Sequence, residues 1–349
     1  MDRGKVARPL PWVGKRWSMR EFSPETWGWQ QPSKNRKLDI LVGSPNERVR
    51  MAGITSHVCT ASLPANAIIW LDEHTTMPSP PLLFAQMAET ASIPALVLLG
   101  NELCGHFSRS ADNPQAGPIT DRLPAATSVS EIASFLEVAA NLSGRTRARE
   151  ALRYISDHAI SSPEAVLATM YSLPPKESGY GMGPVTLNRR ISISDGNGQQ
   201  SVSARYPDLL FSFAPVGINY DGEGHLDLAG LVQSARKAEL ADAENKQQAE
   251  AALSAKLHDV RSKAIDDIQR NRQLAASGYI VFPATKEDIS EWGALDELTR
   301  EILSCARTVF GTDVHRYEET LEDTDRARDR FMLLNAMLPT GTSNHSEIL

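Results

Sequence analysis

Acidic and amide side chains gather in residues 206–225, the run YPDLLFSFAPVGINYDGEGH. Two short apolar stretches predict neighbouring strands, with Asp208 near the start of the first and Asn219 and Asp221 at the end of the second. Side chains alternate between the faces of a strand, so Asn219 and Asp221 point the same way, toward the side that Asp208 also faces. Carboxylates crowded together repel one another unless a cation or a proton intervenes. The run therefore predicts an Mg²⁺-type oxygen site.

Such a site would support metal-assisted hydrolysis of a phosphodiester. A cation held by Asp208, Asp221 and the Asn219 carbonyl would activate water and offset the charge that grows on the phosphate. His225 follows four residues after Asp221 and titrates near neutrality, so it is a candidate general acid or base. The structural alternative is that Asp208 and Asp221 only cap turns at strand ends, where Asp is common.

Several motifs in the same order resemble the PD-(D/E)XK nuclease superfamily, and within it the very-short-patch-repair endonuclease-like branch of uncharacterised bacterial proteins. They are Pro207-Asp208, Asn219-Tyr220-Asp221-Gly222, His225, Asp267-Ile268-Gln269-Arg270 and Gly278-Tyr279-Ile280-Val281. The resemblance covers roughly residues 155–310, which is under half of the chain.

The resemblance implies an α/β fold with a restriction-endonuclease-like core in the order α-β-β-β-α-β. The chain offers a helix at 162–173 and strands at 187–194, 200–212, 215–221 and 279–285 for such a core. It also implies a Mg²⁺-dependent endonuclease acting on DNA. The family's first helix holds a Glu near the metal, and Glu164 takes that position. Arg270 is then a candidate phosphate contact, with an intrahelical ion pair to Asp267 as the structural alternative.

One position departs from the family pattern. The family has a metal-binding Glu where this chain has Asn219. An amide lends a carbonyl oxygen to a cation but brings no charge, and hard divalent ions prefer carboxylates. The alternative function is therefore a catalytically inactive regulator that binds nucleic acid or protein, related to toxin–antitoxin or phage-defence systems.

Composition limits the remaining possibilities. A net charge of −7 is not that of a generic nucleic-acid binder, although a locally basic groove would suffice. The three cysteines, Cys59, Cys104 and Cys305, are far apart and suggest neither a disulfide framework nor a metal-ligand spacing, which fits a reducing cytoplasm. No apolar run is long enough for a membrane span, so we expect a soluble cytoplasmic protein without a membrane partner.

The chain divides by composition into five parts. Residues 1–37 form a basic arm with four of the six tryptophans, suited either to single-stranded nucleic acid or to packing against the body of the protein. Residues 38–128 read as an N-terminal α+β region, with a loop at 106–128. This region weakly resembles AbiEi-related antitoxin proteins through Thr55-Ser56-His57-Val58, Ser79-Pro80 and Leu99-Gly100-Asn101-Glu102-Leu103-Cys104-Gly105. A helical connector (129–158), the nuclease-like domain (159–312) and a C-terminal helix with a disordered tail (313–349) follow.

The nuclease-like part contains an unusual segment, residues 231–276, without Gly or Pro and rich in Ala, Glu, Lys, Gln and Arg. High helix propensity over this length predicts one long helix or a helical hairpin. It is either a solvated projection or an arm that binds a protein partner or a second copy of the chain.

Overall fold

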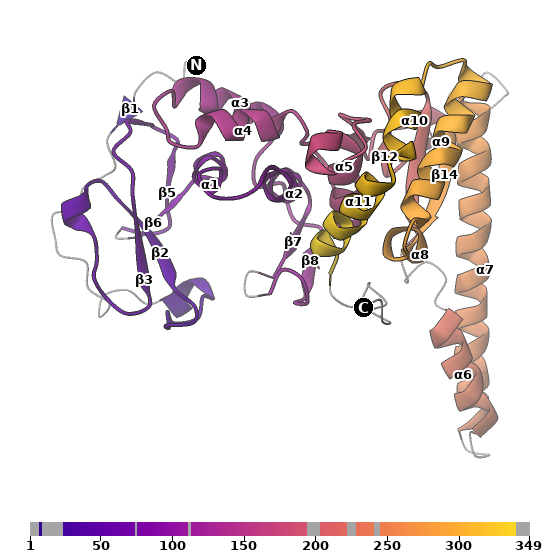
Figure 1. Cartoon of the computed structure of the whole chain (residues 1–349). Helices are drawn as coiled ribbons and strands as arrows, with labels where there is room; N and C mark the ends of the chain where they lie inside the picture. Colours follow the sequence, from indigo (N-terminus) through magenta and orange to yellow (C-terminus); the bar gives the residue numbers. More distant parts are fainter. Residues whose placement is uncertain are drawn as a thin grey trace. The chain divides into compact units, whose positions relative to one another are not determined.

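The computed structural model describes residues 7–8, 24–73, 75–110, 113–193, 203–221, 228–240 and 245–339. The chain is a mixed α/β protein with several small sheets, which confirms the α/β class that the sequence predicts (Figure 1). It divides into two compact units, Met1–Leu96 with Thr127–Leu152, and Val97–Ala126 with Arg153–Leu349. The described part contains no helix of the length and apolarity that crossing a membrane requires.

The described residues of the first unit form three separate strand pairs. Strands β1 (Ala7–Arg8) and β4 (Leu63–Pro64) are antiparallel, β2 (Leu38–Val42) and β3 (Ile54–Val58) are parallel, and β5 (Ile68–Trp70) and β6 (Thr76–Pro78) are antiparallel. The 3₁₀ turns Pro24–Trp27 and Pro45–Glu47 lie before β2 and between β2 and β3. Of the tryptophans in the predicted basic arm, Trp27 is half-buried and Trp29 is 41% exposed, while Trp12 and Trp17 lie outside the described residues.

Helices form the core of the first unit. Helix α1 (Pro80–Met87) packs on α3 (Val129–Val138) and α4 (Arg145–Leu152), and α2 (Ile93–Leu103) begins in this unit. Gly144, in the turn between α3 and α4, has φ 78° and lies so near α1 that a Cβ would sit 2.7 Å from the Ala85 carbonyl oxygen. A side chain at this position would therefore push the turn away from α1.

The second unit is built around one four-stranded sheet. Its strands are β9 (Thr186–Leu187), β12 (Leu209–Leu210), β13 (Val216–Asp221) and β14 (Ile280–Thr285), in the order β14-β13-β12-β9. The pairs β9–β12 and β12–β13 are antiparallel, whereas β13 and β14 run parallel. Pro283 lies in β14, an edge strand, where its missing N–H costs no ladder bond.

The sheet separates two hydrophobic clusters. Val216, Ile218 and Leu209 face a large core that includes α5 (Ser162–Ser172), α9 (Ala294–Phe310) and α11 (Thr324–Met337). Leu210 faces the opposite way, toward a small cluster with Leu274 at the end of α7 (Lys246–Ala276). Because side chains alternate along β13, Asn219 and Asp221 lie on the face that α7 covers.

Smaller elements complete this unit. They are the hairpin β7 (Phe107–Arg109) and β8 (Ile119–Asp121), the 3₁₀ turn Pro175–Glu177, the pair β10 (Ile191–Ile193) and β11 (Ser203–Arg205), and the helices α8 (Lys286–Ser290) and α10 (His315–Glu322). The loop predicted at 106–128 is wrong, because part of it forms β7 and β8. The predicted strands 187–194 and 200–212 are each divided between the main sheet and the β10–β11 pair.

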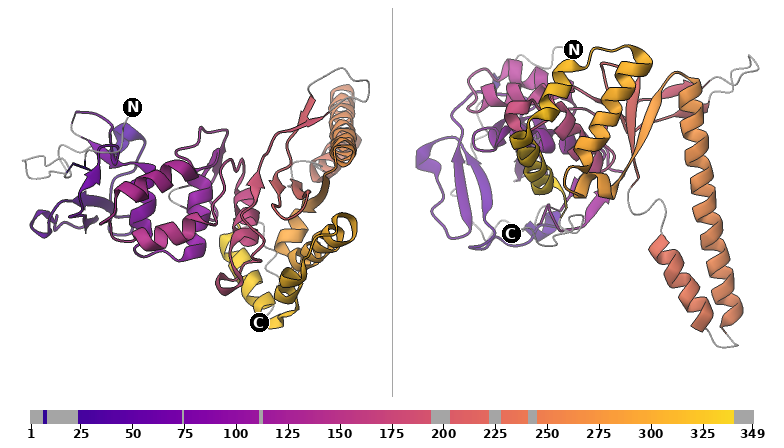
Figure 2. Two further views of the ribbon diagram at one scale, coloured as in Figure 1. Left: turned by 90° about the horizontal axis from the view of Figure 1, so that it is seen from above. Right: turned by 45° about the vertical axis from the view of Figure 1, so that its right-hand side comes forward.

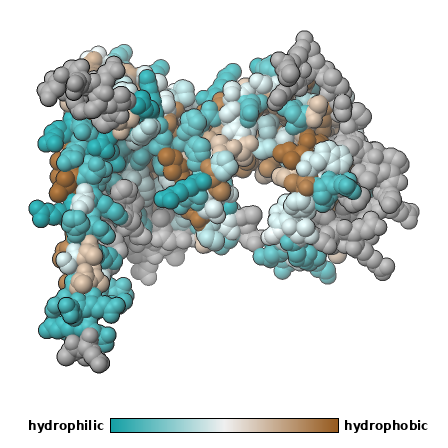
Figure 3. Space-filling view, turned by 180° about the vertical axis from the view of Figure 1, so that it is seen from behind, coloured by the Kyte–Doolittle hydropathy of each residue, from teal (hydrophilic) through white to brown (hydrophobic). Residues whose placement is uncertain are grey.

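The segment 231–276 contains two helices. Helix α6 (Leu228–Leu240) lies along α7, which is one of the two arrangements that the composition left open (Figure 2). On the face that Figure 3 shows, the surface of α6 and α7 is largely hydrophilic, with apolar patches. Three large apolar side chains of α7 are exposed: Leu257 at 49%, Ile265 at 45% and Ile268 at 65%. The predicted tail lies mostly outside the described residues, which end at residue 339.

Candidate functional site

Asp208 and Asn219 face each other across neighbouring strands. The antiparallel register pairs Leu209 with Ile218, so the next opposite pair along the strands is Asp208 and Asn219. The backbone N–H of Asp208 donates to Asn219 Oδ1 at 3.2 Å, and the backbone N–H of Tyr220 donates to Asp208 Oδ2 at 2.7 Å. These two bonds fix both side chains against the backbone of the other strand.

Asp221 and Arg270 meet on the α7 side of the sheet. Arg270 Nη2 lies 3.0 Å from Asp267 Oδ1 and 4.0 Å from Asp221 Oδ1. The intrahelical pair between Asp267 and Arg270 is thus present, and the guanidinium also lies beside a carboxylate of the site. Arg270 is 18% exposed in its side chain, so its position is set by packing as well as by charge.

Glu164 is held at the first turn of α5. Its carboxylate accepts hydrogen bonds from the Ile160 N–H at 3.0 Å, the Ser161 hydroxyl at 2.8 Å and the Asn188 amide at 2.7 Å. In the opposite direction, the Glu164 N–H donates to Ser161 Oγ at 3.4 Å, so Ser161 is the N-cap of α5. Glu164 therefore stabilises the start of α5 as well as standing near Asp208.

Asn188 connects the two acidic residues and was not among the predicted site residues. Its side chain donates to Glu164, and its backbone N–H donates to the Asp208 carbonyl oxygen at 3.1 Å. Its φ of 48° is in the left-handed region, which Asn tolerates better than most residues. In the sequence, Asn188 stands directly before Arg189-Arg190, and nothing in that pattern indicates that its side chain contacts Glu164.

Burial and crowding of like charges perturb the acids of the site. The pKa of Asp208 is raised to about 7, chiefly because burial penalises the ionised form, and further by the Glu164 carboxylate. The Tyr220 N–H and Arg270 oppose that rise. Burial likewise raises the pKa of Glu164, with Asp121 adding to it. Near neutral pH the Asp208 carboxyl is therefore only partly ionised.

A divalent cation fits two of the three predicted ligands. Asp208 and Asp221 offer carboxylates on one face of the sheet, and carboxylate oxygens are the ligands that Mg²⁺ prefers. Asn219 fits less well, because its carbonyl oxygen already accepts the Asp208 N–H. Its Nδ2 is buried without a hydrogen-bond partner among the described residues.

The predicted residues are brought together only in part. Asp208 contacts the end of β13 and interacts electrostatically with Glu164, Asp221 and Arg270, whereas His225 lies outside the described residues. Within the described ranges, no three His, Cys, Asp or Glu side chains are placed so that they could hold a metal ion.

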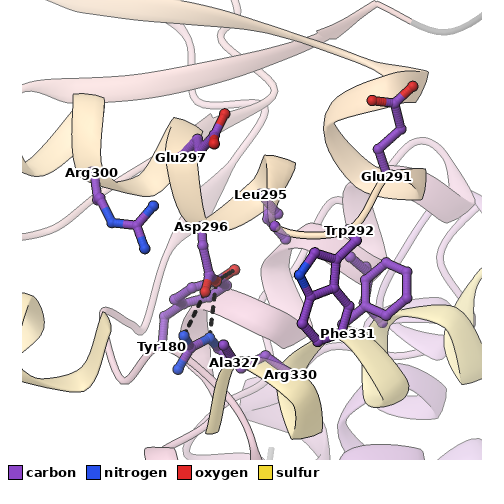
Figure 4. Close-up of a pocket in the computed structure, with 12 residues that line it drawn as sticks. Tyr180, Glu291, Trp292, Leu295, Asp296, Glu297, Arg300, Ala327, Arg330 and Phe331 are labelled. Atoms are coloured by element: carbon purple, nitrogen blue, oxygen red, sulfur yellow. Dashed lines mark hydrogen bonds and ion pairs between the residues drawn. The ribbon is translucent and has the colours of Figure 1, made fainter. Parts of the chain in front are cut away.

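A cavity of about 240 Å³ lies elsewhere in the second unit, between the start of α9 and α11 (Figure 4). Its floor is an ion pair in which Arg330 Nη2 lies 2.6 Å and Nε 2.9 Å from the two Asp296 oxygens. Tyr180 donates its hydroxyl to the same carboxylate at 2.6 Å. Trp292 and Phe331 form an aromatic wall. The charges at its floor satisfy each other and join α9 to α11, so the loss of either partner would leave a buried charge uncompensated.

Neither a protein-family model, nor a curated protein, nor a solved structure matches this chain.

Proposed function

We propose that this protein is a metal-dependent DNA endonuclease-like protein with a PD-(D/E)XK core, hydrolysing phosphodiesters. One observation carries the proposal. Helix α5, the sheet strands β9, β12 and β13, the helices α6 and α7 and the parallel edge strand β14 follow one another, with the β10–β11 pair between β9 and β12. Asp208 directly precedes β12, and Asp221 ends β13 beside Arg270 of α7. That is the order and placement which the motifs of the sequence imply for this superfamily.

The residues of the chain have separate roles in this proposal. Asp208 and Asp221 would hold Mg²⁺, which supplies an activated water and positive charge beside the phosphate when bound. Arg270 presents its guanidinium next to Asp221, where it would contact a phosphate oxygen. Glu164 adds negative charge beside Asp208. The pKa of Asp208 is about 7 without a cation, so a proton and Mg²⁺ compete for the carboxylate, and cleavage at limiting Mg²⁺ should rise with pH toward that value.

A specific observation favours a second candidate, a catalytically inactive regulator that binds nucleic acid or protein. Asn219 replaces an anionic ligand by a neutral amide, and its carbonyl oxygen is engaged by the Asp208 backbone. A site with one carboxylate fewer binds hard cations more weakly. The chain would then have the fold of the superfamily without its catalytic activity, since proteins that share a fold commonly differ in function.

Substitution of Asn219 separates the two candidates. The wild-type chain and the Asn219→Glu variant are incubated with plasmid and single-stranded DNA in Mg²⁺ or Mn²⁺. The endonuclease proposal expects metal-dependent cleavage that the variant keeps or increases, and that Asp221→Ala abolishes. The regulator expects salt-sensitive DNA binding without cation dependence and no cleavage by the wild type. Asp259→Ala, on the exposed side of α7, is the matched control for the loss of one acid.

A further inference from the structure

Two histidines from distant parts of the sequence meet in the second unit, apart from the acidic site. Nε2 of His106 lies 3.3 Å from Nδ1 of His158. The ring planes differ by only 6°, and the ring centres are 5.6 Å apart. Because the nitrogens are much closer together than the ring centres, the rings meet edge to edge with the two nitrogens facing each other.

The tautomer of His106 follows from its other nitrogen. Nδ1 of His106 lies 3.0 Å from the Leu123 carbonyl oxygen, which accepts hydrogen bonds and cannot donate one. Nδ1 therefore carries the hydrogen in the neutral ring, and Nε2 presents a lone pair toward His158. A backbone carbonyl on the far nitrogen is also the arrangement that orients histidines bound to metals.

Backbone contacts hold both rings in place. The His106 N–H donates to the Ala159 carbonyl at 2.6 Å, and the His158 N–H donates to the Cys104 carbonyl at 3.0 Å. The His158 carbonyl accepts the Asn188 amide at 2.9 Å. His158 keeps a φ of 75°, a left-handed conformation that residues other than Gly adopt only where their surroundings enforce it. The fold thus maintains a strained backbone that presents this imidazole.

We propose that His106 and His158 form a binding site for a transition-metal ion such as Zn²⁺, coordinated by these two nitrogens and completed by water. Two imidazole nitrogens bound to a tetrahedral zinc at about 2.0–2.1 Å lie roughly 3.3–3.4 Å apart, and the two nitrogens are already at that spacing. Because they face each other head-on, the exposed His158 ring turns when the ion binds, so that both lone pairs converge on it. His158 is exposed and His106 is half-buried, so an ion reaches the pair from solvent.

A shared proton competes with the metal. Without metal, His158 Nδ1–H donates to His106 Nε2, although 3.3 Å is longer than the 2.7–3.2 Å range of ordinary N–H···O bonds. When metal binds, the hydrogen of neutral His158 resides on Nε2 instead, so both facing nitrogens become ligands with no net release of protons. Imidazole ligands suit zinc, copper and nickel and do not suit Mg²⁺. This site is therefore chemically distinct from the carboxylate site and does not depend on the proposed function.

Calorimetric titration of the full chain with Zn²⁺ tests the pair. His158→Asn is suited to the left-handed backbone, and His106→Gln keeps a polar side chain. His57→Gln is the matched control, because His57 contacts Asp39 at 2.7 Å in the first unit. The proposal expects the wild type to bind one Zn²⁺ at this pair. Each of the two variants should lower the affinity of this site about ten-fold or more, and the control should leave it unchanged. The proposal is overturned if both folded variants bind Zn²⁺ with the affinity of the wild type, or if the wild type binds no Zn²⁺.

A second measurement on the wild type keeps the test independent of how the variants fold. Histidine ring ¹⁵N spectra are recorded while Zn²⁺ is added. The proposal expects the His106 and His158 resonances to shift together as the ion binds. Zn²⁺ binding that leaves both rings unshifted overturns it.

Discussion

Replacing Asp208 by Asn should make the protein more stable at pH 8. The carboxyl is buried beside Glu164 and has a pKa of about 7, so ionising it in the folded chain costs free energy. An Asn of the same shape still accepts the Tyr220 N–H through its carbonyl oxygen and carries no charge. The variant therefore keeps the contact and removes the cost.

The magnitude follows from the change in pKa between the unfolded and folded chain. A rise of roughly three pKa units corresponds to about 4 kcal/mol. The folded state binds this proton more tightly than the unfolded chain does, so the free energy of unfolding falls as the pH rises from about 4 to about 7. Below about pH 4 both states are protonated and the cost disappears. We expect the variant to exceed the wild type by about 2–4 kcal/mol at pH 8 and by little at pH 4.

Urea denaturation at both pH values, in a chelator, measures this difference. Asp259→Asn, an exposed site on α7, should change the free energy of unfolding by no more than about 0.5 kcal/mol at either pH. Added Mg²⁺ should stabilise the wild type at pH 8 and not the Asp208→Asn variant, because a cation that binds only the folded state raises its stability. Equal stability of wild type and Asp208→Asn at pH 8 would refute the account of a crowded, buried carboxylate.

Three further predictions test other parts of the structure by denaturation or by mass. Arg330→Met leaves a buried carboxylate unpaired and should cost about 3–5 kcal/mol, whereas Arg326→Met on the same helix, in an exposed pair, should cost at most about 1 kcal/mol; equal losses would contradict this. Asn188→Ala removes a bond to Glu164 and should cost about 1–3 kcal/mol, with a smaller loss for Asn188→Gly, which relieves the positive φ. If α7 joins two copies, Ile268→Glu should lower the mass measured by light scattering to that of a monomer; an unchanged dimer would exclude this face.

Local patterns accounted for much of the second unit. Alternation in 215–221 correctly placed a strand with Asn219 and Asp221 on one face, because Val216 and Ile218 must turn toward the core. The absence of Gly and Pro from 231–276 predicted helix, and α6 and α7 fill most of it. Both signals are strong because they depend on the periodicity and propensity of many residues.

Other features depend on contacts that no local pattern contains. The three-residue strands β7 and β8 lie in a segment rich in Ser, Asp, Asn, Pro and Gly. The turn propensity of these residues predicted a loop there. Asn188 reaches Glu164 across 24 residues, and His106 reaches His158 across 52. Such pairs are set by tertiary packing, so lone histidines in the sequence gave no indication that they meet.

The cleavage rate of DNA by the wild type and by Asp208→Asn, measured in parallel as Mn²⁺ or Mg²⁺ is added, tests the proposed function most directly. The account predicts cleavage that needs the cation, rises with pH toward about 7 when the cation is limiting, and is lost in the variant even though the variant is the more stable protein at pH 8. Cleavage at the same rate by both proteins, or none by the folded wild type at any cation concentration, would contradict it.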